Sequence, residues 1–381
     1  MNDASSLRRF HGSPVRCCGL VAGGLGLVVT LTAAAAPSAQ SAAPSSVPGP
    51  VTNFGNSLTS VSAVSSSDAW AVGNSPSLAL RWNGTHWART AIPHFGTSLS
   101  ALNGVSALSA SDAWAVGSVG DVSTTTLALH WNGTAWARVA TPSPGQFSQL
   151  TSVSALSPTD AFAVGDLPGL ALHWNGTSWA QAAVPNSANS ALLGVSALSA
   201  SDAWAVGGQR AGNVTKTLVL HWNGASWTQV PSPNVNGNGV LLGVSVLSAT
   251  NAWAVGTSVA GKGTNTLVLH WNGASWTQVP SPNPGKSPVK DSLAGVDALS
   301  ASNVWAVGAS GAKTLVLHWD GTSWTQVPSP SPRGVGIGPF TFLDGVSALT
   351  SSDAWAVGCA CTSDTDSTLI LRWNGKTWTR S

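Results

Sequence analysis

A phrase of about 48 residues recurs along the chain, and its period is the strongest constraint on the fold. Its most constant part is Trp-Ala-Val-Gly, in which one copy has Phe in place of Trp. The central aromatic residues are Trp70, Trp114, Phe162, Trp204, Trp253, Trp305 and Trp355, so successive copies are 44, 48, 42, 49, 52 and 50 residues apart. Four short apolar runs per copy at this period indicate the blades of a β-propeller. We therefore predict an all-β fold, a seven-bladed β-propeller of four-stranded antiparallel blades.

The tryptophans support this count, because all 20 of them fall at three positions of the repeat. The second position is held by Trp82, Trp131, Trp174, Trp222, Trp271, Trp319 and Trp373, and the third by Trp87, Trp136, Trp179, Trp227, Trp276, Trp324 and Trp378. A large ring buried between neighbouring blades stabilises a fold by several kcal/mol. We interpret the tryptophans as core residues, with a sugar-stacking platform as the alternative.

The composition indicates a folded and nearly neutral protein. Hydrophobic residues make up 43% of the 381 residues and charged residues 8%, which excludes extensive disorder. Without the three arginines and the one aspartate of its first 43 residues, the chain has 13 basic and 13 acidic residues. A near-neutral surface lacks the basic footprint of nucleic-acid binding, so no nucleic-acid partner is expected.

The chain divides into a leader, a linker and the repeats. Residues 1–43 have a basic stretch, the apolar run 19–36 and many small residues, so they read as a secretory signal peptide and Ala/Ser-rich leader. Residues 44–57 form a linker, and the propeller spans 58–381, with blades starting near 58, 102, 150, 192, 241, 293 and 343. We expect a secreted, extracellular monomer without membrane contact beyond the leader. Anchoring by an uncleaved leader is the alternative, although the apolar run is short for a membrane span.

Each copy contains signals for four strands in sequence order. The first strand ends at a Ser/Ala/Asp turn, the second is Trp-Ala-Val-Gly, the third ends in His-Trp, and the fourth ends at Pro-Ser-Pro, where proline stops ladder pairing. An Asn-Gly dipeptide predicts a two-residue hairpin turn between strands three and four. In one blade this turn pairs three sets of residues: Trp131 with Thr134, His130 with Ala135, and Leu129 with Trp136. Ring closure needs no borrowed strand, although addition of residues 51–54 to the last blade stays open.

The order Leu-x-x-Val-x-x-Leu, Trp-Ala-Val-Gly and Gly-x-x-Trp over residues 58–381 resembles the photosystem II assembly factor type of β-propeller. It also resembles the wider group with BNR or Asp-box repeats. Gly133 with Trp136, and Gly273 with Trp276, match the Asp box. Asn or Asp320 directly precedes the Gly, so the box is degenerate. The resemblance implies a propeller, usually of seven blades, that serves as a binding or assembly module as often as an enzyme.

Five histidines share one position of the repeat, and arginine replaces them in two copies. The set is His130, His173, His221, His270 and His318, with Arg81 and Arg372. A ring of metal ligands is unsuitable, because equivalent third strands lie more than about 10 Å apart whereas zinc–nitrogen bonds are near ~2.1 Å. We predict a structural role, with a partly buried imidazole beside the Trp and the Asn-Gly turn.

A second column holds acids or amides at the turn between strands one and two. Its members are Asp68, Asp112, Asp160, Asp202 and Asp353, with Asn251 and Asn303. Because Asp and Asn both bond backbone N–H groups in turns, we predict a turn-forming role rather than catalysis.

Two missing residue types limit the possible chemistry. The chain contains neither Tyr nor Glu, which excludes sialidases with a Tyr nucleophile and a Glu partner, and galactose-oxidase-like enzymes with a Tyr radical. A pair of Asp residues could still hydrolyse glycosides. No catalytic motif is present, so we assign no catalytic residue and expect no cofactor.

One loop near the C-terminus carries unusual residues. Cys359 and Cys361 could form a disulfide with each other or between molecules in an oxidising compartment. Asp364 and Asp366 are weak candidates for calcium ligands, the alternative being a solvated loop.

The alternation of strand direction predicts two unlike faces of the disc. The turns between strands one and two and between three and four hardly vary, whereas the loops on the other face differ in length and content. The basic residues of the variable face are our candidates for ligand binding: Arg210, Lys216, Lys262, Lys286, Lys290, Lys313 and Arg333. Its acids are Asp121, Asp166, Asp364 and Asp366.

These features predict an exported, non-catalytic binding or scaffold module for an unknown protein or cell-surface polymer, bound through the variable face. The alternatives are a carbohydrate-binding lectin and an extracellular enzyme acting on glycans. Exposed Phe95, Phe147, Phe340 or Phe342 around a shallow cleft would favour the lectin.

Overall fold

The computed structural model describes residues 57–74, 76–96, 99–166, 168–285, 288–332, 340–362 and 367–381. The predicted leader and nearly all of the linker lie outside this part of the chain. The described residues form 28 β-strands and two 3-10 helices, Ser187–Asn189 and Val235–Gly237. None of the helices in the described residues is long and apolar enough to cross a membrane.

The strands form seven consecutive groups of four. Blade 1 has β1 (Ser57–Ser65), β2 (Asp68–Asn74), β3 (Leu78–Trp82) and β4 (Trp87–Arg89); blade 2 has β5 (Ser100–Ser109), β6 (Asp112–Val119), β7 (Thr125–Trp131) and β8 (Trp136–Val139). Blade 3 has β9 (Leu150–Ser157), β10 (Asp160–Gly165), β11 (Leu170–Trp174) and β12 (Trp179–Ala182); blade 4 has β13 (Ser190–Ser199), β14 (Asp202–Ala211), β15 (Val214–Trp222) and β16 (Trp227–Gln229).

The other three blades repeat the pattern. Blade 5 has β17 (Gly239–Ser248), β18 (Asn251–Ala260), β19 (Gly263–Trp271) and β20 (Trp276–Gln278). Blade 6 has β21 (Asp291–Ser300), β22 (Asn303–Ser310), β23 (Lys313–Trp319) and β24 (Trp324–Gln326). Blade 7 has β25 (Phe340–Thr350), β26 (Asp353–Cys361), β27 (Thr368–Trp373) and β28 (Trp378–Arg380).

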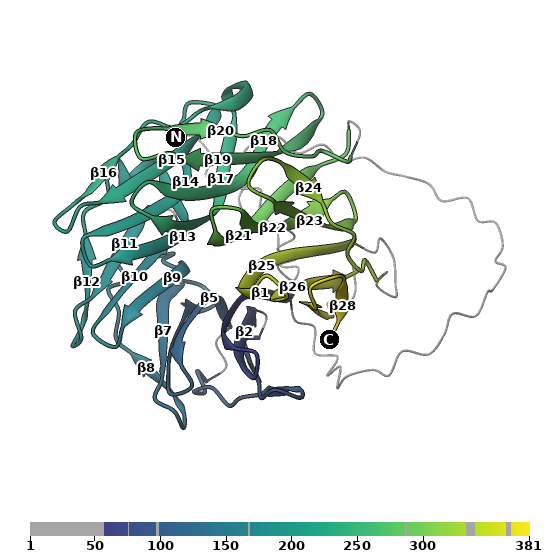
Figure 1. The fold of residues 1–381 in the computed structure, drawn as a ribbon. Coiled ribbons are helices and arrows are strands. Elements are labelled where there is room, and N and C mark those ends of the chain that lie inside the picture. Colours follow the sequence, from purple (N-terminus) through teal and green to yellow (C-terminus); the bar gives the residue numbers. More distant parts are fainter. Residues whose placement is uncertain are drawn as a thin grey trace, which may run out of the picture.

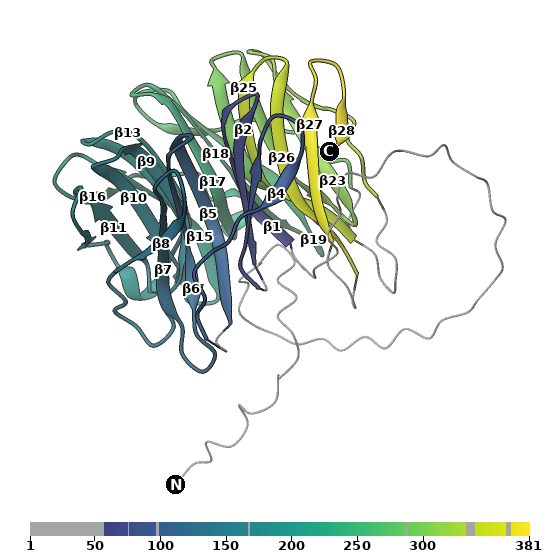
Figure 2. The same ribbon diagram turned by 90° about the horizontal axis from the view of Figure 1, so that it is seen from below.

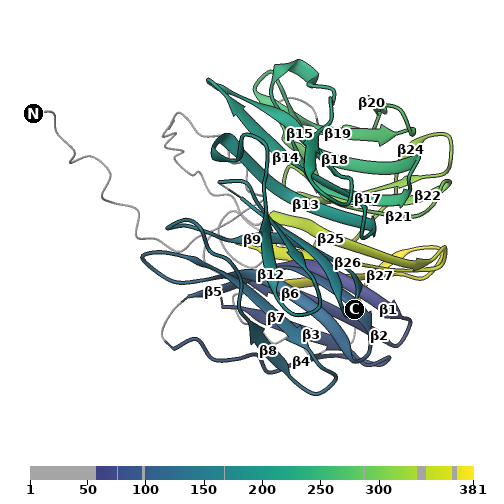
Figure 3. The ribbon, with the colours of Figure 1, turned by 90° about the vertical axis from the view of Figure 1, so that its left-hand side faces the viewer.

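The blades are arranged in a ring. Within each blade the strands pair antiparallel in sequence order, and a single bridge between Asn74 and Ala101 joins the sheets of blades 1 and 2. The first strands of neighbouring blades contact one another around the ring, and β1 contacts β25 and β26 (Figure 1). Figure 3 shows blade 7 between blades 6 and 1. The prediction of a propeller with four-stranded antiparallel blades is therefore confirmed.

Ring closure requires no strand exchange among the described residues, because blade 7 is completed by its own β28. The first and last blades are held together by side chains. The Ala63 N–H donates to Ser347 Oγ at 3.1 Å, and Arg372 donates to the Ser66 carbonyl at 3.3 Å. Residues 51–54, which could have added to the last blade, lie outside the described residues.

Tryptophans fill the seams between blades, as predicted. The first-position ring of one blade packs against the two other tryptophans of the next blade, as Trp70 does with Trp131 and Trp136 at 4.9 Å between centroids. Trp355 makes the same contacts with Trp82 and Trp87 across the closing seam. None of the 20 tryptophans is exposed. Such tilted and edge-to-face pairs add about 0.5–1.5 kcal/mol each beyond the buried area.

The glycine of Trp-Ala-Val-Gly is required by a close backbone approach. A Cβ on Gly117 would lie 1.9 Å from the Ala101 carbonyl oxygen, and one on Gly256 would lie 2.0 Å from that of Val240. Both contacts lie beside an irregularity in the pairing of the first and second strands. Every blade keeps this glycine because the first strand crosses too closely for any side chain.

The predicted register of the Asn-Gly hairpin was wrong. Trp131 pairs with Trp136, His130 with Ala137 and Leu129 with Arg138, so four residues form the loop instead of two. Asn132 Oδ1 accepts the N–H groups of Thr134 and Ala135 at 3.0 Å, and Gly133 has a positive φ of 94°. The side chain of Asn therefore closes a longer loop that the dipeptide alone does not distinguish from a tight turn.

Candidate functional site

The two faces of the disc differ as the sequence predicted. One face, which we name the turn face, carries the turns between strands one and two and between strands three and four of every blade. These turns pack together: a Cβ on Gly133 would lie 3.0 Å from Ser111 Cβ, and Trp131 Nε1 donates to the Ala110 carbonyl at 3.1 Å. The loop face carries the hairpins between strands two and three and the connections between blades, and Figure 2 views the disc from the side.

On the turn face the histidine and acid columns meet, which corrects the prediction that the acids bond turn backbone. His130 Nε2 lies 2.9 Å from Asp112 Oδ1, and His270 Nε2 lies 3.0 Å from Asn251 Oδ1. The backbone of these turns is instead bonded by serine or threonine, as in the bond from Ser111 N–H to Ser109 Oγ at 3.2 Å. The remaining pairs of this kind are His173–Asp160, His221–Asp202 and His318–Asn303.

The two arginines form stronger contacts at the same position. Arg372 makes a bidentate pair with Asp353 at 3.0 Å, and its guanidinium lies 4.8 Å from the ring centroid of Trp355. Arg81 pairs with Asp68 in the same way and also reaches the Ala110 carbonyl of blade 2. The arginines thus connect blade 1 to both of its neighbours, which supports the predicted structural role of this column.

Two of the histidines are held neutral by their surroundings. Burial lowers the pKa of His270. Burial also lowers the pKa of His318, and this effect exceeds the smaller rise that the negative charge of Asp320 causes. Their partners Asn251 and Asn303 carry no charge that would favour the imidazolium. Both imidazoles are therefore uncharged at pH 7 and act as hydrogen-bonding, stacked core groups.

The first strands carry a closed ring of hydrogen bonds that the sequence did not reveal. In each blade one side chain accepts the backbone N–H of the next blade, as Ser62 does from Ala107 at 3.0 Å. The acceptors are Ser62, Ser106, Ser154, Ser196, Ser245, Asp297 and Ser347. Asp297 accepts from Ala348 at 2.7 Å, and burial raises its pKa to about 6. The repeat alignment could have identified this acid as an exception among serines.

The hairpins of the loop face differ in height. The core aromatic residue is followed by the first Leu of the third strand after 8 residues in blades 1 and 3, 13 in blade 2, 10 in blade 6, and 14 in blades 4, 5 and 7. Blade 2 therefore has a long hairpin between two short ones. The connections before and after blade 2 lie along its two sides, through the Gly120–Leu99 hydrogen bond and the Thr124–Phe147 bridge.

The predicted basic residues lie on the loop face but are not gathered into one cluster. Arg210 pairs with Thr215 and Lys216 with Gln209, so the two point to opposite sides of the β14–β15 hairpin. Lys262 lies in the β18–β19 turn, and the Lys290 carbonyl accepts the Gly311 N–H beside Lys313. All five side chains are exposed. Lys286 and Arg333 lie outside the described residues.

The acids of the loop face are engaged locally. Asp121 accepts the Leu99 N–H at 2.6 Å, and Asp166 bonds Gln149. Asp364 and Asp366, the calcium candidates, lie outside the described residues. In the part of the chain that the structure covers, no three His, Cys or Asp side chains come together as metal ligands.

Three large apolar side chains are exposed around the blade 2 hairpin, and the sequence analysis noted only one of them. Leu99 is 62% exposed, Val122 84% and Phe147 58%. The other aromatic candidates for a lectin site do not join Phe147: Phe342 is buried and Phe340 stacks on it in blade 7, while Phe95 is half-buried. The four phenylalanines therefore do not form the exposed aromatic group that would favour a lectin.

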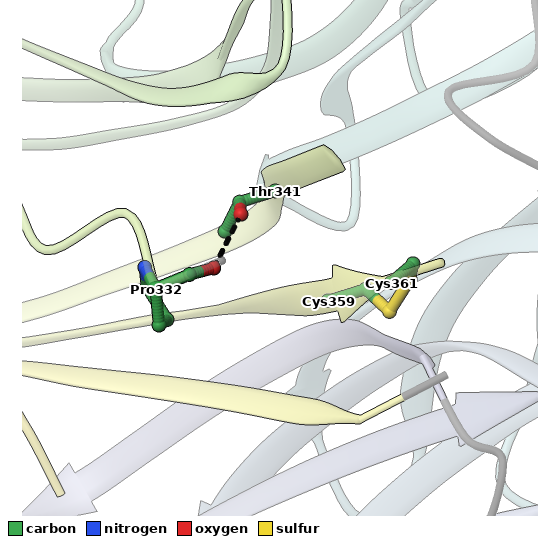
Figure 4. Close-up of a disulfide and its surroundings, with 4 residues drawn as sticks. All are labelled: Pro332, Thr341, Cys359 and Cys361. Carbon is green, nitrogen blue, oxygen red and sulfur yellow. Dashed lines mark hydrogen bonds between the residues drawn. A yellow bond between two sulfur atoms is a disulfide. The ribbon is translucent and has the colours of Figure 1, made fainter. Parts of the chain in front are cut away.

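Cys359 and Cys361 are joined by a disulfide at the end of β26, with Cα atoms 5.4 Å apart (Figure 4). Both are buried in a small cluster with Phe342 and Ala309. In the same blade, Thr341 Oγ1 donates to the Pro332 carbonyl at 2.8 Å. The disulfide thus fastens the loop-face end of blade 7.

The ring of antiparallel blades, with its seams of tryptophan and its uneven loop face, defines the protein as a β-propeller. Comparison with protein-family models and with curated protein sequences gives no match.

Among solved structures, the chain is similar to YCF48 from Cyanidioschyzon merolae, with a TM-score of 0.59 and 18% identity over 86% of this chain and 98% of that one. A structure of YCF48 bound to D1 peptide matches with a TM-score of 0.57 and 15% identity over 86% and 95%. The extracellular domain of BT4673 from B. thetaiotaomicron gives a TM-score of 0.52 and 11% identity over 83% and 39%. These similarities confirm, at the level of fold, the resemblance to the photosystem II assembly factor type of propeller.

Proposed function

We propose that the chain is an exported, non-catalytic propeller that acts as a binding or scaffold module for a protein or cell-surface polymer through its loop face. The observation that carries the proposal is the contrast between the faces. The turn face repeats similar contacts in each blade. On the loop face, the separation between the core aromatic residue and the first Leu of the third strand varies from 8 to 14 residues. Hairpins of different length and sequence on a rigid ring offer a surface for recognition.

The exposed basic side chains of blades 4 to 6 indicate the kind of partner. Arg210, Lys216, Lys262, Lys290 and Lys313 attract acidic groups, and this attraction weakens with ionic strength. A partner with carboxylate or other anionic groups fits this side of the loop face. The structure of YCF48 bound to D1 peptide supports a protein partner for a propeller of this shape.

The test is a screen of the exported chain on peptide and glycan arrays, repeated with two matched variants. The loop-face variant carries Arg210→Ala, Lys216→Ala and Lys262→Ala, and the turn-face control carries Lys376→Ala. We expect the loop-face changes to weaken binding about tenfold or more, with a marked salt dependence, and the control to bind normally. Failure to bind either array, or equal loss in the control, would contradict the proposal.

A further inference from the structure

The described chain begins on the loop face, next to blade 2. Ser57 pairs with Asn74 at the end of β2, and Asn74 pairs with Ala101 near the start of β5. Ser57 and Ala101 are therefore separated by two strand spacings of about 4.8 Å each, and Leu99 lies two residues before Ala101 along the chain. Ser57, the first described residue, therefore lies at the loop-face end of β1, beside the blade 2 hairpin.

The sequence before Ser57 contains an apolar run, residues 19–36, followed by 20 residues up to the ring. A chain of that length spans at most about 70 Å when extended. If this run stays in a membrane, these 20 residues join the membrane to the loop-face end of blade 1, next to blade 2.

The apolar side chains of blade 2 lie at this same place. The Gly120 N–H donates to the Leu99 carbonyl at 2.9 Å on one side of the hairpin, and Thr124 bridges to Phe147 on the other. Val122 lies at the tip between them. All three side chains are exposed, and the carboxylate of Asp121 accepts the Leu99 N–H.

The shape of this feature favours a lipid surface over a peptide. Sites for peptides and small ligands are concave, whereas a hairpin tip is convex and presents its apolar side chains outward. The headgroup region of a bilayer deforms around such a tip and accepts Leu, Val and Phe side chains.

We infer that the blade 2 hairpin, through Leu99, Val122 and Phe147, inserts into the headgroup region of the phospholipid bilayer that holds the retained leader. The inference departs from the sequence prediction that only the leader touches a membrane. It goes beyond the proposed function, because insertion on the blade 2 side leaves the basic hairpins of blades 4 to 6 free for a partner.

The experiment uses the full chain in phosphatidylcholine vesicles, with Cys17→Ser and Cys18→Ser so that one introduced cysteine carries an environment-sensitive dye. The dye is placed by Val122→Cys at the tip, or by Thr134→Cys in the turn-face hairpin of the same blade. We expect a blue-shifted, brighter emission at position 122 only, unchanged by added salt because the tip carries no basic residue. Equal emission at both positions, or recovery of the exported chain only as a cleaved, membrane-free form, would overturn the inference.

A second variant separates apolar insertion from proximity imposed by the tether. In a chain dyed at Ser123→Cys, we expect Leu99→Ser, Val122→Ser and Phe147→Ser together to abolish the emission shift while the unfolding midpoint stays the same, because these side chains are exposed. A shift that survives this change refutes insertion. If the triple variant instead loses an array ligand while the dye reports water throughout, the tip is a protein contact, so the inference fails and the proposed function stands.

Discussion

At the scale of single residues, Asp297 occupies a position where the other six blades have serine. Its carboxylate accepts the Ala348 N–H, but burial raises its pKa from 3.8 to about 6. Because the pKa of Asp297 is higher in the folded state than in the unfolded state, the folded state binds more protons than the unfolded state between pH 3.8 and about 6. The contribution of Asp297 to stability is therefore greatest below pH 3.8 and is lost as pH rises to about 6.

Replacing this acid with the serine of the other blades tests the point. We expect Asp297→Ser to raise the free energy of unfolding at pH 8 by about 1 to 3 kcal/mol and to flatten its pH dependence between about 4 and 6. Asp297→Asn, which keeps the shape without the charge, should show the same flattening. Urea unfolding across this pH range measures both, and an unchanged pH profile in the serine variant would contradict the explanation.

The histidines with asparagine partners respond to pH in the opposite sense. Because burial lowers the pKa of His270, the unfolded chain takes up its proton first as pH falls below 6.5, and stability declines. We expect Asn251→Asp to raise the pKa of His270, as seen by NMR titration, and to reduce the loss of unfolding free energy between pH 7 and pH 5. His221, which already has Asp202, serves as the internal reference. A His270 pKa that does not move would exclude this electrostatic partnership.

The role of a residue could be predicted where it follows from the residue's position in the repeat, but not where it depends on a partner distant in sequence. The tryptophans were predictable because one residue type recurs at fixed positions of the repeat. The pairing of His130 with Asp112 joins residues 18 apart in sequence, on strands whose register the sequence did not specify. Its recognition required the pairing of Trp114 with His130 across β6 and β7.

At the scale of elements, the four-residue hairpin depends on one side-chain oxygen. In blade 4, Asn223 Oδ1 accepts the N–H groups of Ala225 and Ser226 at 3.0 Å. In blade 6, Asp320 Oδ1 accepts the N–H groups of Thr322 and Ser323 in the same way. Hydrogen bonds from these two residues lower the pKa of Asp320 to about 2. The amide nitrogen of Asn is therefore not what the loop requires.

We expect Asn223→Asp to change the free energy of unfolding by less than about 0.5 kcal/mol and Asn223→Ala to lower it by about 1 kcal/mol, because alanine leaves two backbone donors without their acceptor. Thermal unfolding of the two variants at pH 7 gives the comparison. Equal loss in both would show that the loop needs the amide after all.

The strands of each blade were predictable from their apolar runs and turn residues, but hairpin length was not. Asn-Gly specifies a tight turn and a longer Asn-closed loop about equally well, and in the longer loop Gly133 lies against Ser111. On the loop face, the exposure of Leu99 and Val122 depends on the height of neighbouring hairpins. No local pattern within blade 2 contains that information.

At the scale of the whole molecule, the seam between blades 7 and 1 is the one that no chain segment crosses within the described residues. Arg372 holds it from the blade 7 side through Asp353, Trp355 and the Ser66 carbonyl. Arg81 makes comparable contacts at the seam between blades 1 and 2, which the chain does cross. The two arginines thus form a natural comparison.

We expect Arg372→Met and Arg81→Met each to lower the free energy of unfolding by about 1 to 3 kcal/mol, since each leaves a partly buried carboxylate without its partner. Hydrogen exchange should separate them: protection in β1 and β25 should fall in Arg372→Met and be retained in Arg81→Met. Equal exchange in both variants would show that closure depends on the tryptophans alone.

The number of copies and the ring could be predicted because each blade buries its apolar faces only against another blade, and seven copies of one phrase leave no other arrangement of the tryptophans. What lies above the ring on the loop face could not, because it depends on insertions that differ from copy to copy. The proposed partner site and the membrane contact both belong to this irregular part.

The order of strands also sets how the protein responds to mechanical load. The chain enters at the innermost strand, β1, and ends at the outermost, β28, which is three residues long. A force applied at the start of β1 acts along this strand. To extract β1, its hydrogen bonds to β2 and its side-chain bonds to blades 2 and 7 must break at the same time. A force applied at the end of β28 separates this short edge strand from β27 by breaking its hydrogen bonds one after another. The ring therefore resists a load applied at β1 better than one applied at β28.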